Sequence, residues 1–148
     1  MTDKKNPLHG SGTMTTQEIV KLSVERMEPG ADWEMVYGHL YAGIKSNKFR
    51  MLRCGDSLLF FKVDAPIASG AHIFSADPQE KLLHALREFG QSLKAAGYKK
   101  ITGTVRNASL LRLIRKANSI KFQVSDTPIK AYGDTGQVLG YKLEIGIK

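Results

Sequence analysis

Apolar and polar residues alternate in the run VKLSVERM, residues 20 to 27. An alternation with a period of two residues predicts a β-strand in this first segment. A helix is the competing prediction, because Thr15 and Glu18 have the spacing of a capping box, the reciprocal pair of hydrogen bonds that opens many helices.

The next segment has helical spacing. After the break Glu28-Pro29-Gly30, Asp32 is suited to cap a helix whose apolar residues recur every three or four positions. These residues are Trp33, Val36, Tyr37, Leu40, Tyr41 and Ile44.

A strand meander follows this helix. The runs FRMLRC (49–54) and SLLFFKVD (57–64) flank the turn signal Gly55-Asp56, which predicts a β-hairpin. The run IASGAHIFSA (67–76) is a third apolar-rich stretch of strand length. We expect it to add a third strand to the same sheet.

The best-defined predicted helix begins after this meander. Asp77 is expected to cap it, with Pro78 as the first helical residue and Glu80 as the reciprocal capping partner. Gly97 stands where a helix-ending residue with positive φ is favoured. The expected buried stripe consists of Leu82, Leu83, Leu86, Phe89 and Leu93.

The last third of the chain predicts a strand in KKITGTVRN (99–107), then a helix inside RNASLLRLIRKANSIKF (106–122). A strand IKFQVSD and a strand pair around the turn signal YGDTG complete the order. A meander followed by a strand–helix–strand crossing predicts an α/β fold in which helices pack on one mixed sheet.

Length and composition are consistent with one domain. The chain has 148 residues, 42% of them hydrophobic, which is enough to bury a core. We expect a flexible leader over 1–14, because it is polar and rich in Gly and Pro, and a single domain over 15–148. No apolar run is long enough to span a bilayer and no signal segment is evident, so a cytoplasmic location is expected. The lone Cys54 lies in an apolar strand and is expected to be buried.

The charge is unevenly distributed. The net charge is +8, and eight Lys and Arg but no Asp or Glu lie between Phe89 and Ser125. Outside this window the charges balance. A solvated helix face explains such a window, and so does a surface that meets a polyanion.

The helix within 106–122 resembles the second conserved region of the GNAT superfamily of N-acetyltransferases, and the element order resembles the family over residues 18 to 148. Asn107 matches the family's Asn after the central strand, Leu110 its apolar site and Lys116 its Lys. Asn118 stands at the family's Gly, and Ser119 at its Phe. The resemblance implies a mostly antiparallel sheet with one splayed parallel pair. Ile114 stands where the family has a Tyr that protonates the leaving thiolate, and an aliphatic side chain has no proton to donate.

The loop before the long helix departs further from the family. In acetyltransferases of this kind, glycines there present backbone N–H groups to the pyrophosphate of coenzyme A. Here Asp77 and Gln79 stand at those glycines, with Pro78 between them. A carboxylate ~5 Å from a phosphate costs about 3 kcal/mol at an effective dielectric of ~20, about two decades of affinity.

Candidate site residues follow from the resemblance alone, and only if acetyl-CoA binds. They are Ser75, Ala76, Gln79, Lys81, Asn107, Arg112 and Arg115. No catalytic residue is assigned; His72 is a conceivable base, but a structural strand histidine is favoured, and His84 is expected at the edge of the core. None of the histidines has metal-ligand spacing, so no metal site is expected.

Three functions are consistent with these residues. The first is a GNAT-like protein with an eroded acetyl-CoA loop and no cofactor, acting as a binding or structural protein with a protein partner or as a homo-oligomer. Its likeness to small bacteriophage proteins extends this to a virion-associated or accessory role, in the virion or the host cytoplasm. The second is an active acetyl-CoA-dependent N-acetyltransferase. The third is a basic module that contacts nucleic acid nonspecifically through residues 94–121. No membrane partner is expected.

Overall fold

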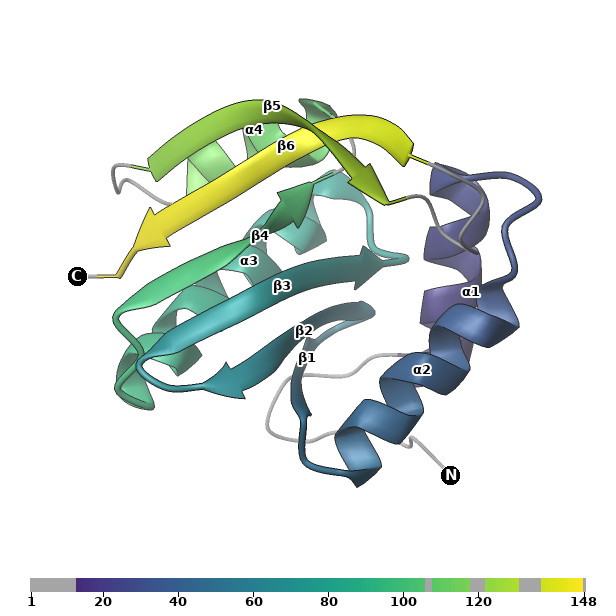
Figure 1. The fold of residues 1–148 in the computed structure, drawn as a ribbon, viewed down its shortest axis with the longest axis horizontal. Helices are drawn as coiled ribbons and strands as arrows, with labels where there is room; N and C mark the ends of the chain where they lie inside the picture. Colours follow the sequence, from purple (N-terminus) through teal and green to yellow (C-terminus); the bar gives the residue numbers. More distant parts are fainter. Residues whose placement is uncertain (1–12, 106–107, 118–121, 131–136, 148) are drawn as a thin grey trace.

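The computed structural model describes residues 13–105, 108–117, 122–130 and 137–147 (Figure 1). The elements in chain order are α1 (Thr16–Met27), α2 (Trp33–Lys45), β1 (Phe49–Cys54), β2 (Ser57–Asp64), β3 (Ile67–Ser75), α3 (Gln79–Ala95), β4 (Lys100–Val105), α4 (Ala108–Ala117), β5 (Phe122–Lys130) and β6 (Gln137–Gly146). Residues 106–107, 118–121 and 131–136, which include Asn107, Asn118, Ser119 and the YGDTG turn signal, lie outside the described residues.

The strands form one six-stranded sheet in the order β1-β2-β3-β4-β6-β5. Only the central β3–β4 pair is parallel, and every other neighbouring pair is antiparallel. The predicted mixed sheet with helices packed on it is therefore confirmed, as are the meander and the strand–helix–strand crossing from β3 through α3 to β4.

The predicted strand over residues 20 to 27 is wrong, because this segment belongs to helix α1. Thr15 Oγ1 accepts a hydrogen bond from the Glu18 N–H, and Glu18 Oε1 accepts one from the Thr15 N–H, so the capping box is complete. The buried residues Ile19, Val20, Ser23 and Val24 have helical spacing. Ser23 is a small polar residue that is buried on this helical face. Because Val20, Leu22 and Val24 alternate with polar residues, the sequence also has the period of a strand.

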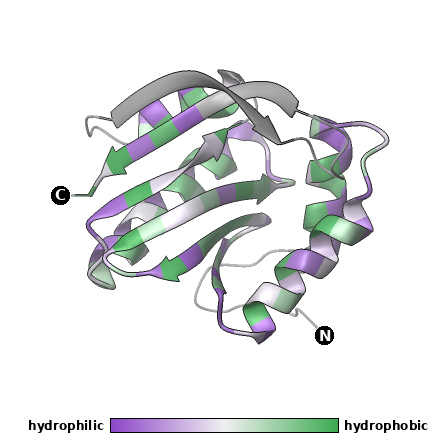
Figure 2. Ribbon diagram, in the orientation of Figure 1, coloured by the Kyte–Doolittle hydropathy of each residue, from purple (hydrophilic) through white to green (hydrophobic). Residues whose placement is uncertain are grey.

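Helices cover both faces of the sheet. Leu59 and Phe61 of β2 pack in the core under α3 and α4, whereas Leu58 and Phe60 pack in the core under α1 and α2. Both faces of β2 are buried, which explains its continuous apolar run SLLFF. In contrast, polar and apolar positions alternate over residues 142–145 of β6 (Figure 2), where Leu143 and Ile145 are buried.

Local details of the core agree with the sequence. Cys54 is buried, and burial raises the pKa of its thiol, with a further rise from the Glu88 and Asp77 carboxylates. Gly97 ends α3 with a φ of 88°. His84, expected at the edge of the core, is instead exposed, with 67% of its side-chain surface accessible. None of the helices in the described part of the chain is long and apolar enough to cross a bilayer.

The parallel pair is short. Its last paired residues are Ala71 and Gly103, so residues 72–75 and 104–105 continue beyond the paired region. At Gly103 the strands are so close that a Cβ atom would overlap the Ala71 carbonyl oxygen. A glycine is therefore needed where the two strands begin to separate.

We expect Gly103→Ala to lower the free energy of unfolding by about 1–3 kcal/mol, since an added methyl in packed backbone forces strand displacement. Gly146→Ala is the matched control, because a Cβ there meets nothing within 4 Å and both changes restrict the unfolded chain equally. Urea unfolding measures the free energy of unfolding of the two variants. Equal stabilities would contradict the close approach at Gly103.

Candidate functional site

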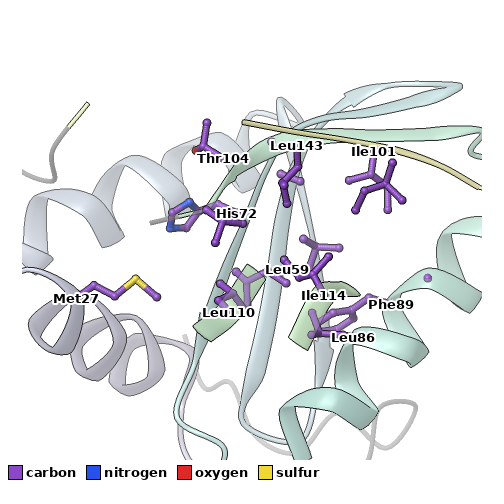
Figure 3. A pocket seen from close by; sticks show the side chains of 16 residues that line it. Met27, Leu59, His72, Leu86, Phe89, Ile101, Thr104, Leu110, Ile114 and Leu143 are labelled. Carbon is purple, nitrogen blue, oxygen red and sulfur yellow. The ribbon is translucent and has the colours of Figure 1, made fainter. Parts of the chain in front are cut away.

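A cavity of about 70 Å³ lies where β3 and β4 separate. Residues of β3, β4 and β6 line it together with Leu86 and Phe89 of α3 and Leu110 and Ile114 of α4. Figure 3 shows His72 and Thr104 at one side of the cavity, and Ile114, Leu86 and Phe89 at the other. Since one water needs roughly 10–15 Å³ of such space, the cavity has room for only a few waters.

The cavity walls are almost entirely apolar. Among the described residues that line it, His72 and Thr104 are the ones with a polar side chain. The His72 ring is half-buried and lies 4.5 Å from the ring of Phe74, centroid to centroid. Ile114 is only 5% exposed, and it contributes an aliphatic wall to this space.

The carboxylate of Asp77 does not cap α3, which corrects the sequence prediction. Its Oδ2 atom accepts hydrogen bonds from the Asp56 N–H (3.0 Å) and from the Ser57 hydroxyl (2.8 Å). Helix α3 begins at Gln79, with Pro78 before it and no side-chain cap. The Asp56 N–H in the β1–β2 turn and the buried Ser57 hydroxyl lie close to the Asp77 carboxylate. They bind it in place of the N–H groups of the helix.

The serine hydroxyls at this point form a directed chain. Because a carboxylate only accepts, Ser57 must donate to Asp77, so in the 2.7 Å contact between Ser57 and Ser75 the donor is Ser75. Ser75 Oγ in turn accepts from the Asp77 N–H at 3.1 Å. The Ser57 hydroxyl, the Ser75 hydroxyl and the Asp77 N–H therefore all have hydrogen-bond partners within this chain.

The loop from 76 to 78 has no backbone donor left for a ligand. The Ala76 N–H donates to the Asp56 carbonyl oxygen at 2.9 Å, and the Asp77 N–H donates to Ser75. Pro78 has no N–H. The nearest N–H groups without a side-chain cap are those of Gln79, Glu80 and Lys81, in the first turn of α3.

Asp56 joins the same network to the start of α1. Its carboxylate accepts from the Thr13 N–H at 2.9 Å and from the Met14 N–H at 3.1 Å. Arg53, which is only 2% exposed, donates to Asp56 and to the Met14 carbonyl. A signal for this network was present in the sequence, because Arg53 is a charged residue in an apolar strand just before the Gly55-Asp56 turn.

The predicted cofactor residues fall into two groups. Ser75 and Ala76 lie in the hydrogen-bonded loop, and Gln79 and Lys81 are exposed in the first turn of α3. Arg112 and Arg115 lie on the exposed face of α4, where Arg112 donates to Ser109 Oγ at 3.2 Å. Asn107 lies outside the described residues. No group of three or more His, Cys, Asp or Glu suited to a metal occurs within the described ranges.

Comparison with solved structures gives one informative match. The chain is similar to a chimera of the spermidine N-acetyltransferase SpeG from Vibrio cholerae and hSSAT, with a TM-score of 0.52 over 88% of this chain and 90% of that one. The chain has a GNAT-like fold. At 9% sequence identity the likeness is one of fold alone. No protein-family model matches the chain, and no curated protein sequence matches it.

The Asp77–Ser57 hydrogen bond is testable by a double-mutant cycle. Asp77→Ala and Ser57→Ala are expected to show a coupling free energy of about 0.5–3 kcal/mol, because the two residues share one network. Glu80→Ala with Ser57→Ala is the control pair, expected to add within about 0.5 kcal/mol. If Asp77 instead capped α3, both pairs would add.

Proposed function

We propose that this GNAT-fold protein acts by binding another macromolecule and not by transferring an acetyl group from acetyl-CoA. The observation that carries the proposal is the state of the loop from 76 to 78. In acetyltransferases the equivalent loop presents backbone N–H groups to pyrophosphate. Here those groups are used by Asp56 and Ser75 or are absent at proline.

Charge at the loop opposes a phosphate as well. The Asp77 carboxylate is half-buried beside the start of α3, and Glu80 is exposed in the first helical turn. Removing a hydrogen-bonded carboxylate from its partners to admit a phosphate would leave the Asp56 N–H and the Ser57 hydroxyl without their acceptor, at a cost of about 1–3 kcal/mol each.

Space at the parallel pair is also small. Ligand pockets in proteins have volumes of about 300–1,000 Å³, whereas the cavity between β3 and β4 has about 70 Å³. Ile114 and Leu110 contribute to filling it. The residues present therefore do not fit acetyl-CoA.

One observation favours the alternative function, an acetyl-CoA-dependent N-acetyltransferase. The first turn of α3 has no side-chain cap, so its N–H groups are open to an anion, and Lys81 lies in that turn. His72 lines the nearby cavity. In this alternative a phosphate would bind at the N–H groups of the first turn of α3 and not at the loop from 76 to 78.

Thermal unfolding with millimolar acetyl-CoA separates the two functions. A ligand at 100 times its Kd adds about 2.7 kcal/mol to native stability, which raises the melting temperature of a domain of this size by roughly 8 °C. We expect no rise with acetyl-CoA.

A rise would contradict the proposal. If it were smaller in Lys81→Glu than in the control Lys48→Glu, the phosphate site would lie at the first turn of α3. Lys48 is an exposed lysine on the α2–β1 connection, so the two variants change the net charge equally.

A further inference from the structure

The outer faces of α3 and α4 form one cationic surface. Both helices pack on the same face of the sheet, where their apolar sides share a core (Figure 1). Glu80 and Glu88 are the acidic residues of these two helices. The exposed cations are Lys81, Arg87, Lys94, Arg112, Arg115 and Lys116.

The rotation of α3 turns Arg87 and Lys94 toward α4, whereas Glu88, and Lys81 seven residues before it, lie on another side of the helix. Gly90 lines the cavity together with Leu110 and Ile114 of α4, so this side of α3 faces α4. Arg87 and Lys94 lie three residues before and four residues after Gly90, on the same side, and Glu80 in the first turn, seven residues before Arg87, shares this side.

The opposite side of α3 faces β1. There Ser92 and Ala96 line a cleft beside the strand, and Glu88 is near enough to Cys54 to raise the pKa of its thiol. The acidic residue in the middle of α3 is therefore directed away from the junction with α4.

Most of these cations lack an acidic partner. Within the described residues, Arg87, Lys94 and Lys116 form no ion pair, and Arg112 bonds only to the neutral Ser109 hydroxyl. In contrast, Lys100, the first residue of β4, forms an ion pair with Glu144 at 2.7 Å. In the part of the chain that the structure describes, the positive charge of Arg87, Lys94, Arg112 and Lys116 is thus not neutralised by an ion pair.

We propose that this α3–α4 surface binds the phosphate backbone of duplex nucleic acid without reading its sequence. The inference rests on the proposed function and names the class of its partner. Guanidinium and ammonium groups on a solvent-exposed surface pair with phosphates, and arginine does so in bidentate geometry.

The surface lacks the features of other partners. A protein interface usually has an apolar or aromatic centre, but the large exposed hydrophobic residues of the described chain, Met35 and Val63, belong to α2 and β2. Single-strand binders stack bases on aromatic side chains, and Phe89, the aromatic residue of these two helices, is buried.

The dimensions are adequate for several phosphate contacts. At about 1.5 Å per residue, the 17 residues of α3 span about 25 Å. Duplex DNA carries one charge per about 1.7 Å of its axis, so this length faces about 15 phosphate charges. Four protein cations can each reach one of them.

Fluorescence anisotropy with a labelled mixed-sequence 20-base-pair duplex tests the inference. If four cations each neutralise one phosphate, the logarithm of the binding constant should fall with the logarithm of salt concentration with a slope of about −3.6. The test variant neutralises four cations of the surface and is expected to bind at least tenfold more weakly at 100 mM salt, with a slope that is shallower by about 3.6. Its changes are Arg87→Gln, Lys94→Gln, Arg112→Gln and Lys116→Gln.

The control variant removes two arginines and two lysines from exposed positions elsewhere, so the two variants have the same net charge. It should keep the slope and nearly all of the affinity. Its changes are Arg26→Gln, Lys48→Gln, Arg50→Gln and Lys62→Gln. Thermal unfolding verifies that both variants are folded.

Three results would overturn the inference. These are equal losses in both variants, tighter binding to a 20-nucleotide single strand than to the duplex, and no duplex binding at 100 mM salt. Each would leave the proposed function intact as long as acetyl-CoA does not raise the melting temperature, so the two failures are distinguishable.

Discussion

The structure depends on two hydrogen-bonded carboxylates, that of Asp56 in the β1–β2 turn and that of Asp77 before α3. Asp77 accepts from the Asp56 N–H and the Ser57 hydroxyl, while the Asp56 carboxylate accepts from Thr13 and Met14. These bonds join the start of α1, the turn and the approach to α3. Because the helices lie on opposite faces of the sheet, the network also aligns the two cores.

The same network underlies the proposal that this protein does not transfer an acetyl group from acetyl-CoA. A loop that binds pyrophosphate must keep its N–H groups free, whereas a loop that holds three elements together must use them. In this chain Ala76 and Asp77 use theirs internally, and proline follows. Ile114 and Leu110 then help fill the space between the separating strands. Internal satisfaction of the loop and aliphatic packing of the cleft point in the same direction, toward a stable scaffold.

The scaffold carries a group of exposed cations on α3 and α4. The alternating residues of β6 and the amphipathic α4 place apolar side chains inward, so the arginines and lysines of α4 remain exposed. Glu88 of α3 faces β1, away from Arg87 and Lys94. A binding function therefore needs no cavity here, since an extended polyanion is recognised by surface charge alone.

Sequence by itself determined what depends on neighbouring residues: the period of α3, the β1–β2 hairpin, the buried Cys54 and the apolar face of α4 with Ile114. It left α1 ambiguous, because Val20, Leu22 and Val24 suit a strand and also a helix. Only the tertiary structure decided the role of Asp77, whose partners are 20 and 21 residues away. A carboxylate before a helix is a good cap in isolation. Which donors bind the Asp77 carboxylate depends on contacts between residues that are distant in sequence. Local sequence patterns do not encode these contacts.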